Sequence, residues 1–110
     1  MNYQEQFLIY RELPGAEWII EGMKQIEQEQ EETESSLLVQ IGSPRLQRLG
    51  FSMPFFPQQQ EPPEHRLYRR LAQHYQNDAH SRYNALIRHL VSFERALERS
   101  HSANKQPQIP

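Results

Sequence analysis

The fold is decided above all by residues 79–99, which read AHSRYNALIRHLVSFERALER. At 100° per residue, apolar side chains fall within one narrow arc of a helix, at Ala79, Tyr83, Leu86, Leu90, Phe93 and Leu97. Three arginines, Arg88, Arg95 and Arg99, fall together on the opposite side. The pattern predicts a long helix with one apolar face and one arginine face.

A second amphipathic helix is predicted from Pro14 to about Gln30. Proline suits the first position of a helix, because the N–H that it lacks would have no partner there. Apolar residues recur along one side, at Ala16, Ile19, Ile20, Met23 and Ile26. The preceding residues 7–10, FLIY, fit either a helical face or a short strand, so that segment stays ambiguous.

Residues 35–50 are predicted to form two short helices with a tight turn between them. Thr33 or Ser35 can cap the first helix, and the pair Ser43-Pro44 repeats the start signal for the second. A glycine ends each helix, at Gly42 and Gly50. This arrangement permits a helix-turn-helix that offers Arg45 and Arg48 to DNA, but the second helix is short for a recognition helix, and a structural corner is the alternative.

A proline-rich linker is predicted over residues 51–62. Its apolar residues are too many for a freely solvated segment, so they are expected to pack across a helix surface: Phe51, Met53, Phe55 and Phe56. Residues 63–100 are then predicted to form a basic helical hairpin, in which Asn77 closes the first helix and Asp78 caps the second. The polar residues 101–110 are expected to be a disordered tail.

These elements predict an all-α fold of about four to five helices in a single domain, residues 1–100, with an acidic N-terminal part over 1–50. Val, Ile and Thr total only ten of the 110 residues, so a substantial sheet is improbable. The hydrophobic content of 36% limits the size of the core. We therefore expect a protein partner or self-association to supply part of the stability.

The charges are divided along the chain, although the net charge at pH 7 is only −2. Residues 1–34 hold nine acids and two bases, a balance of −7, whereas residues 35–110 hold ten bases and five acids, a balance of +5. Either the two halves fold onto one another, or the basic half meets an acidic partner.

The arginine faces are the first candidate site. They comprise Arg66, Arg69 and Arg70 on one helix, and Arg88, Arg95 and Arg99 on the next. Guanidinium groups bind carboxylate or phosphate bidentately, so these residues are interaction candidates. The alternatives are an ordinary solvated face or a surface for the chain's own acidic half. Nucleic acid is not favoured, because the total charge is negative and no recognised binding motif is present.

Trp18 is the last interaction candidate, because it points away from the apolar stripe of its helix. Gly15 and Gly22 lie about one turn to either side and would leave a shallow groove there. Either another segment, such as Phe55 and Phe56, covers the tryptophan, or it anchors an interface.

Catalytic and cofactor sites are not expected. The chain has no cysteine, which excludes disulfides and thiolate chemistry, and it has no metal-ligand motif, glycine-rich phosphate loop or nucleophile elbow. Arg–His pairs separated by four to six residues resemble the motif of HEPN-class ribonucleases, at Arg69 and His74, Arg82 and His89, and Arg95 and His101. Seven arginines and five histidines within residues 65–101 supply such pairs by chance, so an enzyme is not favoured.

The sequence therefore predicts a small non-enzymatic protein-interaction or regulatory subunit, with no cofactor. No apolar stretch approaches the length of a membrane span, and the absence of cysteine fits a reducing compartment, so a cytoplasmic protein is expected. The alternative is a nucleic-acid-associated protein, either a transcriptional regulator or a HEPN-like ribonuclease.

Overall fold

The computed structural model describes residues 3–28, 31–56 and 60–104. In these ranges every regular element is helical, which confirms the predicted all-α class. The elements are the 3-10 helix η1 (Tyr3–Tyr10), α1 (Ala16–Glu27), α2 (Glu34–Arg48), α3 (Pro63–Tyr75), the short 3-10 helix η2 (Gln76–Asp78) and α4 (Ala79–Asn104).

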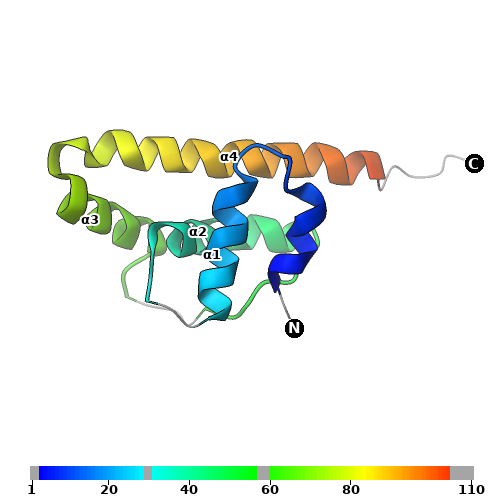
Figure 1. The fold of residues 1–110 in the computed structure, drawn as a ribbon, viewed down its shortest axis with the longest axis horizontal. Helices are drawn as coiled ribbons and strands as arrows, with labels where there is room; N and C mark the ends of the chain where they lie inside the picture. Colours follow the sequence, from blue (N-terminus) through cyan, green and yellow to red (C-terminus); the bar gives the residue numbers. More distant parts are fainter. Residues whose placement is uncertain (1–2, 29–30, 57–59, 105–110) are drawn as a thin grey trace, which may run out of the picture.

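The four α-helices pack around one core. Helix α4 runs along the top of Figure 1, with α2 and α3 beneath it, while α1 lies across α2 and η1 packs beside α1 (Figure 1). The largest fully buried side chains come from η1 and all four α-helices: Phe7, Ile19, Met23, Leu37, Leu38, Val39, Leu46, Leu67, Leu71, Phe93 and Leu97.

Helix α4 confirms the predicted division into two faces. Its apolar stripe lies in the core, apart from the half-buried Tyr83, and its three arginines are exposed. The helix continues to Asn104, so residues 101–104, which were predicted to belong to the disordered tail, form its last turn. Residues 105–110 of that predicted tail lie outside the described residues.

Helix α1 begins later and ends earlier than predicted. Its N-cap is Gly15, which has a left-handed backbone with φ of 80°. A Cβ at this position would lie 2.3 Å from the carbonyl oxygen of His89, so glycine permits both the turn and the close approach to α4. The helix ends at Glu27, and the predicted end at Gln30 lies outside the described residues.

Helix α2 is one continuous helix, so the prediction of two short helices was wrong. Thr33 caps it as predicted, since its hydroxyl accepts a hydrogen bond from the Ser36 backbone N–H at 3.0 Å. The predicted break fails because Gly42 is buried against α4, where the side chain of Leu90 would lie 2.7 Å from an added Cβ. Burial of this face outweighs the local cost of Pro44 inside the helix.

The helix-turn-helix interpretation was also wrong, because it required α2 to break at Gly42 into two helices. Arg45 and Arg48 lie in the last turn of α2, on the same helix that begins at Glu34, so no separate recognition helix carries them.

Most of the linker's apolar residues pack as predicted. The ring of Phe51 stacks on that of Phe7 with centroids 4.7 Å apart, and Met53 and Phe56 pack against the core. Phe55 does not, since it is 86% exposed.

Residues 7–10, which fitted either a helix or a strand, belong to the 3-10 helix η1. Its three-residue period turns Phe7 and Tyr10 inward and leaves the two residues between them exposed.

Candidate functional site: two arginine-lined depressions

Five of the six predicted arginines line two separate depressions on the protein surface. The α2–α4 depression has a volume of about 530 Å³ and is lined by Arg45, Arg95, Glu98 and Arg99. The α2–α3 depression has a volume of about 230 Å³ and is lined by Glu32, Leu37, Arg66, Arg69, Arg70 and Gln73. Arg88 is exposed and lines neither of them.

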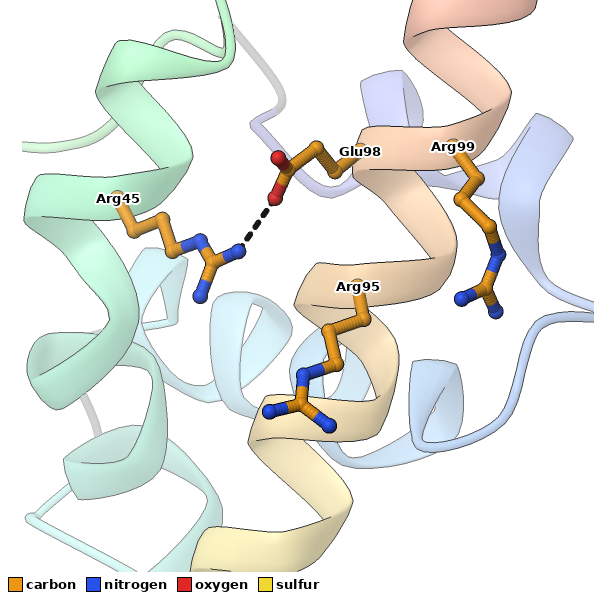
Figure 2. Close-up of a pocket in the computed structure, with 4 residues that line it drawn as sticks. All are labelled: Arg45, Arg95, Glu98 and Arg99. Carbon is orange, nitrogen blue, oxygen red and sulfur yellow. Dashed lines mark hydrogen bonds and ion pairs between the residues drawn. The ribbon is translucent and has the colours of Figure 1, made fainter.

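In the α2–α4 depression, Arg45 reaches from α2 towards α4 and meets Glu98 (Figure 2). Arg95 and Arg99 project from successive turns of α4. Neither has an ion-pair or hydrogen-bond partner among the described residues. The depression thus holds three guanidinium groups against one lining carboxylate.

A second carboxylate, Glu94, lies behind this depression. It is 6% exposed, and its Oε1 lies 3.7 Å from Nη1 of Arg45. Burial raises the pKa of Glu94, and the nearby guanidinium groups of Arg45 and Arg48 offset only part of this rise. Arg45 therefore pairs with a buried carboxylate, Glu94, and with an exposed one, Glu98.

Arg45 and Glu94 were not among the predicted residues of this site. Arg45 was placed on a separate short helix, either a structural corner or a helix that could face DNA, and only the continuity of α2 brings it to α4. Glu94 follows Leu90 by four residues, so it falls at the edge of the apolar stripe of α4. A carboxylate at such a position needs a basic partner from another element, and that signal was available in the sequence.

The prediction that the arginines of α3 form one exposed face was wrong for Arg66, which lines the α2–α3 depression but is buried. It is 8% exposed, and its guanidinium binds the carboxylate of Glu32 and donates to Oε1 of Gln40 at 2.8 Å. Glu32 belongs to the acidic N-terminal part, so this pair joins the acidic part to the basic hairpin. Arg69 is exposed and pairs with Glu61 at 2.6 Å.

Trp18 is half-buried against α4. Its ring stacks on that of His89, with centroids 5.8 Å apart and an interplanar angle of 29°. The predicted cover from Phe55 is wrong, because that side chain points to solvent. The predicted groove is also wrong, because α4 fills the space at Gly15 and α2 fills the space at Gly22.

Of the three Arg–His pairs that resemble the ribonuclease motif, Arg82 and His89 take part in two separate contacts. The guanidinium carbon of Arg82 lies 3.7 Å from the ring centroid of Tyr75, and His89 contacts Trp18 instead. Across the described part of the chain, no group of three or more His, Cys, Asp or Glu side chains is arranged to hold a metal ion. None of the described helices is both long and apolar enough to cross a membrane.

Comparisons of the chain with protein-family models, curated proteins and solved structures find no match. The fold and the surface define the protein as a small all-α protein with two arginine-lined depressions.

Proposed function

We propose that this is a non-enzymatic interaction module that binds carboxylate groups of an acidic protein segment in the α2–α4 depression. The observation that carries the proposal is the pair Arg95 and Arg99, which have no partner in the described part of the chain and flank an open hollow beside Arg45. Guanidinium groups stay charged at neutral pH and present several fixed donors, so such a cluster binds oxyanions and does not exchange protons.

The mixture of charges favours a protein over a nucleic acid. Glu98 lies among the arginines, and Glu94 lies close behind them. A phosphate backbone carries a dense row of like charges and would meet these carboxylates, whereas protein interfaces pair acids and bases individually. The two depressions also divide the arginines, which limits the number of phosphates that one surface can neutralise.

The direct test measures binding of a fluorescently labelled peptide of glutamates, with a glutamine peptide of equal length as the reference. At about 0.15 M salt, we expect the glutamate peptide to bind and the glutamine peptide not to bind. The double variant Arg95→Glu with Arg99→Glu should weaken binding by at least about tenfold, since two charge-assisted contacts become repulsive. Equal binding of the two peptides would contradict the proposal.

Arg88→Glu is the matched control. Arg88 lies on the arginine face of α4, about 10.5 Å from Arg95 along the helix axis, but outside the depression. Peptide binding should change less than about twofold, within the range of a screened surface charge. An effect as large as that of the double variant would show that the whole helix face binds, and not the depression.

A further arm measures binding of labelled single-stranded RNA and duplex DNA at about 50 and about 200 mM salt. With three guanidinium groups at the α2–α4 depression, binding that rests on charge alone should fall by roughly 20- to 40-fold between the two conditions. Submicromolar binding at the higher salt that the double variant loses would replace the proposal with nucleic-acid binding.

A further inference from the structure

The α2–α3 depression is not used by the proposed function and has its own unbalanced chemistry. Two of its three arginines are paired with carboxylates, Arg66 with Glu32 and Arg69 with Glu61. Arg70 is half-buried and has no ion-pair or hydrogen-bond partner among the described residues. One positive charge therefore remains uncompensated beside this hollow.

The depression also contains hydrogen-bond donors that lack acceptors. Within the described residues, the Nε atoms of Arg66 and Arg70 are buried and have no hydrogen-bond partner. Nη1 and Nη2 of Arg66 each donate to an acceptor, Glu32 and Gln40, whereas its buried Nε–H donates to none of the described residues. Buried donors are rarely left without acceptors, and each such exception needs a physical account.

We propose that the α2–α3 depression binds a small oxyanion, a carboxylate or phosphate group, with Arg70 as its principal ligand. Rotation of the Arg70 side chain into the hollow would present its Nε–H and one Nη–H to two oxygens of the same group, the bidentate geometry that guanidinium favours. Arg66 and Gln73 line the same depression, and the Nε–H of Arg66 and the side-chain amide of Gln73 are further donors for the remaining oxygens.

The size of the depression favours a small ligand. Its volume of about 230 Å³ is below the range of about 300–1,000 Å³ that is typical of pockets for drug-sized molecules. Its single uncompensated charge matches one oxyanion group, and the carboxylates of Glu32 and Glu61 oppose a ligand of higher charge. A phosphate ion or a small carboxylic acid satisfies both conditions.

The proposal is tested by NMR of the arginine Nε–H groups in the full chain, at about pH 6 and constant ionic strength maintained with sodium chloride. Inorganic phosphate is titrated in one arm and acetate in the other, which distinguishes the two oxyanions. Saturable shifts of the Arg70 and Arg66 signals are expected in at least one arm, with the Arg88 signal unchanged. Equal shifts of all arginine signals, or shifts that do not saturate, would overturn the proposal.

Two variants locate the site. Arg70→Gln should weaken oxyanion binding by about tenfold or more, the effect of losing one charge-assisted bidentate contact. Arg70→Lys keeps the charge but loses the bidentate guanidinium geometry, so it should also weaken oxyanion binding. Undiminished binding in both variants would refute the site. Thermal melts of both variants check that they fold.

A double variant, Arg95→Gln with Arg99→Gln, removes two of the three arginines of the α2–α4 depression and separates the two sites. This double variant should lose glutamate-peptide binding and keep the oxyanion response of Arg70. If the oxyanion response disappears with it, the ions occupy the α2–α4 depression and the present inference fails. Loss of peptide binding alone bears only on the proposed function.

Discussion

The carboxylate of Glu94 lies 3.7 Å from the guanidinium of Arg45, at the crossing of α2 and α4, where it is almost completely buried. The backbone of α2 can approach this carboxylate because residue 42 is glycine, and an added Cβ there would lie 3.3 Å from Oε2 of Glu94. Arg45 also binds Glu98 at the surface. An acidic ligand in the α2–α4 depression would therefore compete with Glu98 for Arg45, which at the same time pairs with the buried Glu94.

The first prediction concerns the pH dependence of stability at Glu94. Burial raises its pKa above the ordinary value of 4.5, so the folded state binds this proton more tightly than the unfolded state does. Its contribution to stability is therefore largest below pH 4.5 and is lost as the pH rises through the folded pKa. Glu94→Gln mimics the protonated form and should raise the Tm at pH 7.

Thermal melts of wild type and Glu94→Gln between pH 7 and about pH 4.5 check this prediction. The gain in Tm should shrink as the pH falls, because the wild-type carboxyl becomes protonated. A lower Tm for the variant at pH 7 would show that the ion pair with Arg45 outweighs burial. A difference that stays constant over this range would show that the pKa of Glu94 is not raised.

The second prediction tests the apolar stripe of α4. Leu90→Asp places an unpaired charge in the core against Gly42 and should cost more than about 4 kcal/mol, a large part of the total stability of a small domain. Chemical denaturation measures the loss. Ser92→Asp on the exposed side of the same helix is the control and should change the stability by less than about 0.5 kcal/mol. Similar effects of the two substitutions would mean that the stripe does not face the core.

The third prediction concerns the contact between α1 and α2 at Gly22. An added Cβ would lie 2.4 Å from the carbonyl oxygen of Ser35 and 2.7 Å from Cγ2 of Val39. Gly22→Ala should therefore destabilise the protein by about 1–3 kcal/mol, although alanine favours an isolated helix by about 1 kcal/mol. Urea denaturation of Gly22→Ala beside the exposed control Lys24→Ala checks this, and a stabilised Gly22→Ala would exclude the close helix contact.

The fourth prediction compares two arginines of α3 that both pair with glutamates. Arg66 has a side chain that is 9% exposed and also donates to Gln40, whereas the side chain of Arg69 is 58% exposed. Arg66→Met should cost about 1–3 kcal/mol, since it removes buried charge-assisted hydrogen bonds. Arg69→Met should cost between about 0 and 1 kcal/mol. Equal unfolding free energies for the two variants would contradict the internal role of Arg66.

The sequence by itself determined the features that depend on neighbouring positions of one helix. The 3.6-residue period defined the buried stripe of α4 and the exposed positions of Arg88, Arg95 and Arg99. The cap at Thr33 was also predictable, because its hydrogen bonds are made within one turn of α2.

Only the tertiary structure decided which helix faces meet. Residues 42–44 carry a local signal to end a helix, yet α2 continues because packing against Leu90 supplies more free energy than the local signal removes. The same long-range packing buries Arg66 beside Glu32, places His89 on Trp18, and brings Arg45 to the arginines of α4. Periodicity assigns a residue to a face of its own helix, but the contacts of that face depend on how distant segments pack, which a local pattern does not encode.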